Sequence, residues 1–313
     1  MKNRMALFGV MVLILVLGIG ALVTTWKPKT RTVGKLQIVT TLFPWYDFAR
    51  SLVGNDGTVT LLLPPGVDAH SFEPSPRDIQ TIEQADVLMY SGNTMEPWLK
   101  GLLSSLASQQ LTVVDASAGI QLIGAVFHDP DEPVGTLDPH FWLDFGNDQL
   151  VIDHLQQILS ERDPTHQQDY LSRAKQLKQQ LTALDLQYQQ TFSSCPNKTL
   201  VYGGHYALGY LAKRYGLQYR AAQGVAPDAE PSAQDLVNLV DDIKANHVLT
   251  VYDEALSSPK IAQTLANETQ AKLLAINPAH NVSKADLDSG VTFVEIMEHN
   301  LHQLVEGQPC PTL

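Results

Sequence analysis

The sequence predicts an α/β fold with two lobes, each formed by a parallel sheet flanked by helices and joined by a long rigid backbone helix. Short apolar runs alternate with helical stretches in the first half of the 313-residue chain, and the same alternation returns in the second half. Between them lies a long stretch with helical periodicity and no Gly or Pro. Repeated β–α alternation is typical of parallel sheets covered by helices.

The first half contains four short apolar runs separated by three amphipathic stretches. The expected strands are Leu36–Leu42, Thr58–Leu63, Val87–Tyr90 and Leu111–Asp115. The expected helices are Tyr46–Val53, Pro76–Gln84 and Met95–Ser108. Together they predict an N-terminal lobe over residues 35–148.

The centre of the chain has a different pattern. A helical pattern over Gln149–Ser160 is followed by Thr165–Phe192, which contains neither Gly nor Pro. Apolar residues in that second stretch recur at steps of three and four, as on one face of a helix. They are Tyr170, Ala174, Leu177, Leu181, Leu184 and Tyr188. At ~1.5 Å per residue the helix would span roughly 40 Å, longer than a small domain needs. We interpret residues 149–193 as helices that link two lobes; the alternative is one long surface helix on a single domain.

The second half repeats the strand and helix pattern of the first. The expected strands are Thr199–Tyr202, Gln218–Ala222, Val248–Tyr252 and Ala271–Ile276. The expected helices are Tyr206–Tyr215, Ser232–Asn246 and Pro259–Glu268. Ser232 followed by Asp235 is a suitable N-terminal cap for its helix. These elements predict a C-terminal lobe over residues 198–308.

The composition narrows the range of functions. The net charge is −12, whereas a protein that binds nucleic acid needs a basic face. We therefore expect no nucleic-acid partner, and an acidic protein is compatible with handling cations. The hydrophobic content of 44% is normal for a globular protein with buried cores.

The N-terminus predicts export from the cytoplasm. Lys2 and Arg4 precede an apolar run of 19 residues, Met5–Val23. Its length favours an uncleaved membrane anchor, which needs roughly 17–25 residues, over a signal peptide with about 7–15. Residues 1–26 are thus an anchor or a cleaved signal peptide, and the rest of the chain lies outside the cytoplasm. No Cys stands directly after the run, which argues against lipid attachment there.

The chain has two cysteines, Cys195 and Cys310. Outside the cytoplasm, two cysteines that are the only ones in a chain are expected to form a disulfide; the alternative is two unpaired thiols. One cysteine comes just before the second lobe and the other just after it, so the bridge would close that lobe into a loop.

Four of the ten histidines have matching places in this pattern. His70, His205 and His280 each follow a predicted strand, and His140 opens a short apolar stretch of its own. Consecutive members are 65 to 75 residues apart, so only the fold can bring them together. Ligands in open α/β sheets bind beyond the carboxyl ends of the strands. Four imidazoles converging there would form a closed, nitrogen-only site, which favours zinc.

The remaining histidines are expected to be ordinary solvated or hydrogen-bonded side chains. They are His128, His154, His166, His247, His299 and His302. His128 lies in an acidic stretch, 128–132, that could hold a cation loosely.

Several separate motifs around these histidines resemble one family. They are Pro64-Pro-Gly-Val-Asp-Ala-His-Ser-Phe-Glu-Pro-Ser-Pro76, Asp138-Pro-His-Phe-Trp-Leu-Asp144 and Gly203-Gly-His-Tyr-Ala-Leu-Gly-Tyr-Leu-Ala-Lys-Arg-Tyr-Gly-Leu217, with Glu230-Pro-Ser232, Ser258-Pro-Lys-Ile-Ala262 and Phe293–Leu301. From about Leu36 to Leu304 the chain resembles the metal-specific solute-binding proteins of bacterial ABC importers, the cluster A-I group that serves zinc and manganese.

The resemblance implies two lobes joined by a long helix, with one metal ion held between them. By position, His70, His140 and His205 look like the first three ligands. Manganese-type members carry a carboxylate at the third position and zinc-type members a His, which this chain has. At the fourth position, where the family commonly supplies Asp or Glu, the loop reads Ala275-Ile-Asn-Pro-Ala-His-Asn281. We favour His280 as fourth ligand, with Asn277 or a water molecule as alternatives.

The resulting hypothesis is an extracytoplasmic, monomeric protein that captures Zn²⁺ as cargo and delivers it to the membrane permease of an ABC transporter. An enzyme is disfavoured, because four His leave no open position for a reacting water and no His-Glu-x-x-His motif is present. Alternatives are a manganese- or iron-binding member of the same family and a zinc-containing surface adhesin. We expect carboxylates to orient the imidazoles from outside the ligand set. The candidates are Asp144, Glu230, Asp253 and Glu254.

Overall fold

The computed structural model describes residues 34–106, 110–125, 135–225, 231–308 and 310. Within it, Leu36–Leu313 forms one compact unit. The predicted anchor or signal segment, residues 1–26, and the acidic stretch 128–132 lie outside the described residues. Among the helices of the described residues, none is long and apolar enough to cross a membrane.

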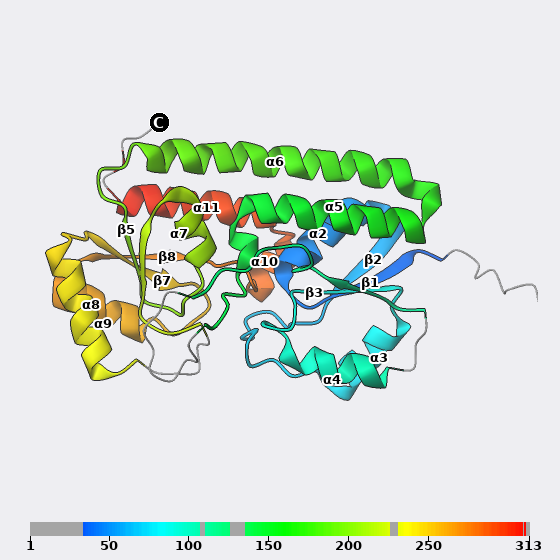
Figure 1. The fold of residues 1–313 in the computed structure, drawn as a ribbon, viewed down its shortest axis with the longest axis horizontal. Helices are drawn as coiled ribbons and strands as arrows, with labels where there is room; N and C mark the ends of the chain where they lie inside the picture. Colours follow the sequence, from blue (N-terminus) through cyan, green and yellow to red (C-terminus); the bar gives the residue numbers. More distant parts are fainter. Residues whose placement is uncertain (1–33, 107–109, 126–134, 226–230, 309, 311–313) are drawn as a thin grey trace, which may run out of the picture. The chain divides into compact units, whose positions relative to one another are not determined.

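Two four-stranded parallel sheets form the framework (Figure 1). The first contains β1 (Leu36–Thr40), β2 (Gly57–Leu61), β3 (Val87–Tyr90) and β4 (Thr112–Asp115), in the order β2-β1-β3-β4. The second contains β5 (Thr199–Tyr202), β6 (Gln218–Ala221), β7 (Thr250–Glu254) and β8 (Lys272–Ile276), in the order β6-β5-β7-β8. The two sheets therefore share one topology, and the predicted fold class is confirmed.

Helices cover both faces of each sheet, as the alternation of buried strand residues requires. Val39 and Leu88 face α3 (Pro76–Gln84) and α4 (Pro97–Ser105). Ile38 and Met89 belong instead to a core that includes α2 (Phe43–Val53). In the second sheet Val201 packs with α8 (Ala233–Ala245) and α9 (Lys260–Thr269), while α7 (Gly209–Tyr215) and α11 (Phe293–Gly307) contribute to the opposite face. A short helix, α10 (Lys284–Ser289), precedes α11.

Two long helices connect the sheets. A 3₁₀ turn, η2 (Phe141–Leu143), leads into α5 (Phe145–Arg162), and η3 (Pro164–His166) connects α5 to α6 (Gln167–Ser193). Figure 1 shows α6 running beside α5 and then beside α11, and α6 also packs against α2. Its buried face contains all six of the residues predicted from the periodicity.

One apolar core includes residues of both sheets. Leu36 from β1 and Leu200 from β5 belong to the same cluster, which continues through α2, α5, α6 and α11. The predicted disulfide is present: Cys195, after α6, is bonded to Cys310, with their Cα atoms 4.4 Å apart.

The bounds of several predicted elements need correction; α5, for example, begins at Phe145 instead of Gln149. Helix α2 begins at Phe43 instead of Tyr46, because Pro44 is tolerated in a first helical turn. Helix α7 begins at Gly209, since residues 205–208 form a loop. Strand β7 is shifted to Thr250–Glu254, which places Glu254 at the carboxyl end of the sheet. The predicted cap of α8 is confirmed, because Ser232 and Asp235 form a reciprocal capping box.

Candidate metal centre

The fold brings the four predicted histidines to one place. His70 lies in the loop after β2, His205 in the loop after β5 and His280 in the loop after β8, while His140 directly precedes η2. The first three therefore lie beyond the carboxyl ends of strands, where α/β sheets bind their ligands. His140 and His205 are completely buried, and His280 is 6% exposed.

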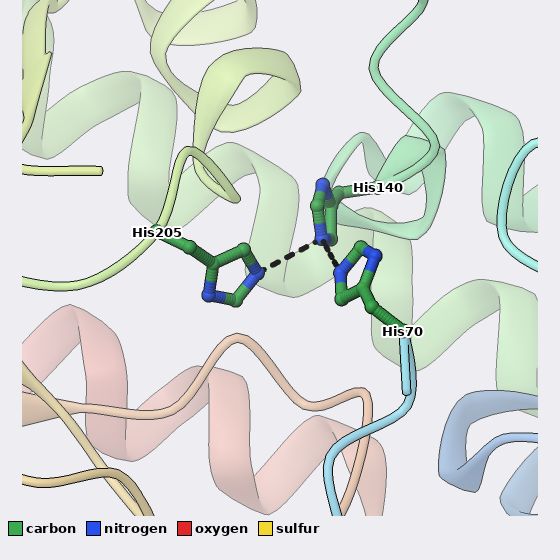
Figure 2. A group of neighbouring side chains, drawn as sticks. All are labelled: His70, His140 and His205. Carbon is green, nitrogen blue, oxygen red and sulfur yellow. Dashed lines mark hydrogen bonds between the residues drawn. The ribbon is translucent and has the colours of Figure 1, made fainter. Parts of the chain in front are cut away.

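Three imidazoles point toward a common centre (Figure 2). The Nε2 atom of His140 lies 3.3 Å from Nε2 of His70 and 3.1 Å from Nε2 of His205. A tetrahedral zinc ion with Zn–N bonds of 2.0–2.1 Å separates its nitrogen ligands by about 3.3 Å. These two separations match those of a tetrahedral site, and the ligand atoms of all three histidines lie within 4.8 Å of one another.

His280 lies beside this group. Its ring centroid is 5.8 Å from that of His205, and the two rings with Glu254 form a second set whose ligand atoms lie within 4.8 Å of one another. Among the described residues Nδ1 of His280 has no hydrogen-bond partner, although it is buried. A buried imidazole nitrogen without a partner is costly unless it binds something. His280 is thus able to supply a fourth nitrogen.

The alternative fourth residue, Asn277, already uses its side chain within the loop. The side-chain Oδ1 of Asn277 accepts a hydrogen bond from the backbone N–H of Ala279 at 2.7 Å. The backbone N–H of Asn277 donates to Oδ1 of Asn300 at 2.9 Å. The amide oxygen thus closes a local turn, and this arrangement favours His280 over Asn277 as a metal ligand.

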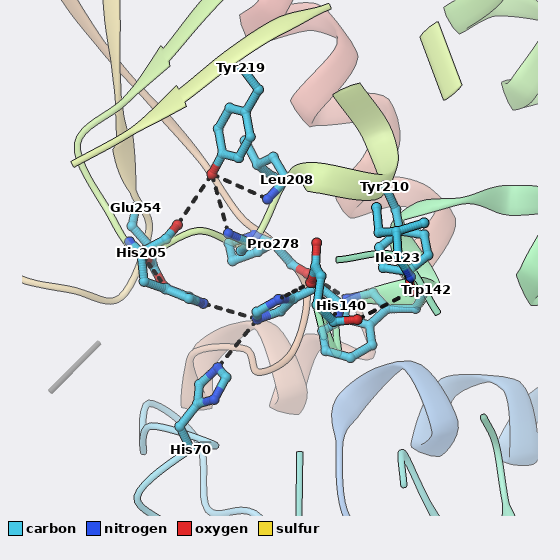
Figure 3. A network of polar contacts seen from close by, with 12 residues as sticks. His70, Ile123, His140, Trp142, His205, Leu208, Tyr210, Tyr219, Glu254 and Pro278 are labelled. Carbon is cyan, nitrogen blue, oxygen red and sulfur yellow. Dashed lines mark hydrogen bonds and ion pairs between the residues drawn. The ribbon is translucent and has the colours of Figure 1, made fainter. Parts of the chain in front are cut away.

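Two carboxylates orient the rings from outside the three-histidine group (Figure 3). Oδ1 of Asp138 accepts from Nδ1 of His140 at 2.8 Å, and Oε2 of Glu254 accepts from Nδ1 of His205 at 2.7 Å. Each contact fixes the tautomer that leaves Nε2 unprotonated and facing the common centre. Both carboxylates also hold the backbone N–H of the same histidine, at 2.9 and 3.2 Å.

Two glycines make room for these carboxylates. A Cβ atom at Gly204 would collide with the carboxylate of Glu254, and one at Gly209 would collide with that of Asp138. The residue before His205 must therefore lack a side chain if Glu254 is to reach the imidazole.

The predicted set of orienting carboxylates is right for Glu254 and wrong for Asp144. Asp144 instead caps α5 by accepting from the Gly146 amide at 2.8 Å, and it forms an ion pair with Arg214. Among the described candidates only Glu254 contacts one of the four histidines; Glu230 lies outside the described residues. Asp138 was not among the predicted carboxylates, although an Asp two residues before a candidate ligand is a visible signal in the sequence. Asp68 also lies two residues before a histidine, but its Oδ1 accepts from the backbone N–H groups of His70 and Ser71 and from the Ser71 hydroxyl instead of from the ring.

Burial and charge set the protonation of the four rings. Burial lowers the pKa of His70 and His140 well below 6.5, and the neighbouring imidazoles lower it further. Burial also lowers the pKa of His280, although the Glu254 carboxylate opposes it. At His205 burial acts in the same direction, but the Glu254 carboxylate outweighs it and raises the pKa. Three of the four rings thus favour the neutral form that binds metal.

The remaining described histidines take no part in this group. His166 pairs with Asp163, and His302 lies near Glu306 on the surface of α11. The four histidines thus form a single cluster of imidazoles among the described residues, and His128 lies outside those residues.

Known proteins have sequences similar to this one. Residues 38–307 match the family described as zinc-uptake complex component A, periplasmic. The high-affinity zinc uptake system protein ZnuA of Bacillus subtilis (strain 168) is 34% identical over 280 residues, which cover 87% of this chain and 88% of the relative. The zinc-binding protein AdcA of Streptococcus pyogenes serotype M3 is 32% identical over 287 residues, which cover 87% of this chain. This chain spans only 56% of the length of that relative.

A solved structure gives the same result. The Zn(II)-bound ZnuA-like domain of Streptococcus pneumoniae AdcA superposes with a TM-score of 0.76 at 32% identity, covering 88% of this chain and 99% of that one. Fold and sequence together define the class of protein: a ZnuA-like protein built on two parallel sheets. Within this class, the chain belongs to the family of zinc-uptake complex component A, periplasmic. The resemblance predicted from the motifs is confirmed.

Proposed function

We propose that this protein captures one Zn²⁺ ion with His70, His140, His205 and His280 and delivers it to an ABC permease for uptake. The observation that carries the proposal is the convergence of three Nε2 atoms, that of His140 lying 3.3 Å from His70 and 3.1 Å from His205, with two of the rings oriented by carboxylates through Nδ1. Neutral imidazoles without a carboxylate in the group suit zinc better than manganese, which prefers oxygen ligands. The names of the zinc-binding relatives support the same metal.

The zinc ion would be cargo held between two lobes. We assign the lobes to residues 35–148 and 198–308, with the linking helices over 149–193. The Nδ1–carboxylate contacts of His140 and His205 preorient two ligands before the ion arrives, and loss of the proton from an imidazole would accompany binding. Release to the permease requires these four side chains to separate.

The permease partner, the monomeric state and the location complete the proposal. The periplasmic family and the lipoprotein relative from Streptococcus pneumoniae support a place outside the cytoplasm. This chain has only Cys195 and Cys310, so we infer that residues 1–26 serve as a membrane anchor or cleaved signal instead of a site of lipid attachment.

Metal analysis of protein purified without added metal, followed by competition titration, tests the function. We expect one zinc per chain and much weaker binding of manganese. Equal competition by manganese would show that the four-histidine assignment is wrong, and the absence of bound zinc at any stoichiometry would overturn the function itself.

A further inference from the structure

The loops that carry His70 and His280 are joined by a single side chain. Asn281 is completely buried, and its Nδ2 donates to the carbonyl oxygen of Pro64 at 2.8 Å and to that of Val67 at 2.7 Å. A backbone hydrogen bond from Gly66 to the carbonyl of Val282, at 3.1 Å, lies beside them. Residues 64–67 thus form three hydrogen bonds with the two residues that follow His280.

The two loops belong to different sheets. Residues 64–70 follow β2 of the first sheet, and residues 277–282 follow β8 of the second. The contact therefore runs between the halves of the molecule, immediately beside two of the four imidazoles. Asn281 is the direct neighbour of His280, and Val67 precedes His70 by three residues.

The chemistry of this contact requires a primary amide. One nitrogen supplies two N–H groups, and both are used on carbonyl oxygens. The side-chain oxygen accepts from the Val282 amide at 2.7 Å, so both polar atoms of the Asn281 side chain are engaged. An Asp in the same place would turn a carboxylate oxygen toward two carbonyl oxygens and would remove both donors.

Two further hydrogen bonds hold the His280 loop against residues of the first half of the chain. The carbonyl of His280 accepts from the Phe43 amide at the start of α2, at 3.1 Å, and the carbonyl of Pro278 accepts from Nε1 of Trp142 at 2.8 Å. Between them Ala279 is buried with φ of 62°, a left-handed conformation that is unfavourable for a residue with a Cβ. The loop keeps this conformation because its neighbours determine it.

We propose that Asn281 is a positioning residue that couples the His70 and His280 loops, so that these two imidazoles move as one unit. The proposal rests on the proposed function, because it takes both histidines as zinc ligands. Zinc then dissociates only when the two amide hydrogen bonds of Asn281 break or when the coupled pair moves away from His140 and His205. Asn281 thus controls the dissociation rate of the ion without touching it.

The test compares Asn281→Asp with Asn300→Asp. Asn300, on α11, supports the same loop because its Nδ2 donates to the Asn277 carbonyl at 2.6 Å. Asn300 and Asn277 both belong to the second half of the chain, so this contact does not join the two halves. Both exchanges are isosteric, and both sites are buried. We expect Asn281→Asp to raise the zinc dissociation rate at least about tenfold, the lower range for loss of an outer partner. Asn300→Asp should change it less than about threefold.

Two further measurements separate positioning from simple loss of structure. In the Co²⁺-substituted protein, Asn281→Asp should alter the intensity of the visible bands, which report ligand geometry, while the circular dichroism spectrum of the apo protein remains unchanged. In a His280→Ala background, the additional effect of Asn281→Asp on zinc dissociation should fall below about threefold, because one of the coupled ligands is already missing.

The outcomes are distinguishable. If the wild-type protein binds zinc and Asn281→Asp leaves dissociation unchanged, the coupling is wrong and the proposed function stands. If the wild-type protein binds no zinc, both fail. Should Asn281→Asp not fold, hydrogen exchange of the Gly66 amide in the wild-type protein decides: protection in both the apo and the zinc-bound state supports the coupling, and rapid exchange in either state contradicts it.

Discussion

A single oxygen, Oδ1 of Asp138, holds both the backbone N–H and the ring Nδ1 of His140, at 2.9 and 2.8 Å. The two residues are separated by one proline, so the carboxylate is placed by the local chain and not by a distant element. The same acid thus fixes where the loop runs and which ring nitrogen faces the centre.

Replacement of this carboxylate should weaken zinc binding. In Asp138→Asn the negative charge that stabilises the metal-bound imidazole is lost, and we expect a decrease in affinity of roughly 10–100-fold. Competition titration with a chelator of known affinity measures it. Asp144→Asn is the matched control, because Asp144 pairs with Arg214 and contacts none of the four rings. An equal loss in both variants would mean that the effect is not specific to the ring contact.

Removal of the His280 imidazole tests the fourth ligand. His280→Ala should lower zinc affinity while the fold remains intact. The decrease should exceed the roughly 10–100-fold loss expected when a residue that hydrogen-bonds to a ligand is replaced. Asn277→Ala should have a smaller effect, since Oδ1 of Asn277 already accepts from Ala279. His280→Glu should retain zinc and bind manganese better, because it adds an oxygen donor. A greater loss in Asn277→Ala than in His280→Ala would show that the loop register is wrong.

The pKa shifts predict a two-stage dependence of zinc affinity on pH. The pKa of His205 is raised because Glu254 outweighs burial, so His205 carries a proton to higher pH than an ordinary imidazole. Just above pH 6.5 zinc therefore competes mainly with the proton of His205, and affinity should fall by at most about tenfold per pH unit. The pKa values of His70, His140 and His280 are lowered, so their protons compete only below about pH 6.5, where the slope should steepen.

The Glu254→Gln variant provides the control for this dependence. It removes the charge that raises the pKa of His205, so the slope above pH 6.5 should flatten even though the affinity itself is lower. A slope that corresponds to two or more protons at neutral pH in the wild-type protein would contradict the assignment, and a flat response down to pH 5 would indicate oxygen ligands.

Loss of the disulfide should destabilise the protein without changing the site. Cys195 and Cys310 are 115 residues apart, and closing a loop of this length stabilises by up to roughly 4–5 kcal/mol in the chain-entropy model. The Cys195→Ser/Cys310→Ser double variant should lower the free energy of unfolding by up to that amount in a denaturant titration. Its zinc stoichiometry should remain one per chain, whereas loss of zinc binding in the folded variant would mean that the tail supports the site.

A buried acid at the start of α5 should cost stability at neutral pH. Burial raises the pKa of Asp148 well above 3.8, and neither carboxylate oxygen has a hydrogen-bond partner among the described residues. Above pH 3.8 the unfolded chain loses this proton more readily than the folded one, so stability falls as pH rises toward the folded pKa. Asp148→Asn should therefore raise the free energy of unfolding at pH 7. A decrease measured by denaturant titration would show that the acid has a stabilising role.

Much of the fold was predictable because its signals are local. Strands buried on both faces appear in the sequence as short apolar runs, and α6 appears through its steps of three and four. The errors fall where a local signal is ambiguous. Pro44 made the start of α2 look like a loop, although the first turn of a helix accepts it, and the residues around His205 have helical composition but serve as a ligand-bearing loop.

The histidines of the site were predictable from their places after strands, but their partners were less so. Asp138 lies two residues before His140 and orients its ring, whereas the predicted Asp144 lies four residues after it and caps α5. The contacts of Asn281 join residues 217 and 214 positions apart. No local pattern predicts them, because they depend on how the two sheets are placed against each other.

The apolar cluster shared by β1, α2, α5, α6, β5 and α11 has a consequence for folding. Each half has a smaller cluster of its own, but the largest cluster is shared, since Trp45 and Phe48 in the first half and Phe293 in the second pack into the same buried region. A fragment that ended before α5 would expose these aromatic rings to water, at a cost that no remaining contact offsets. The two sheets, although alike in topology, therefore share one core, and we expect them to unfold in a single transition.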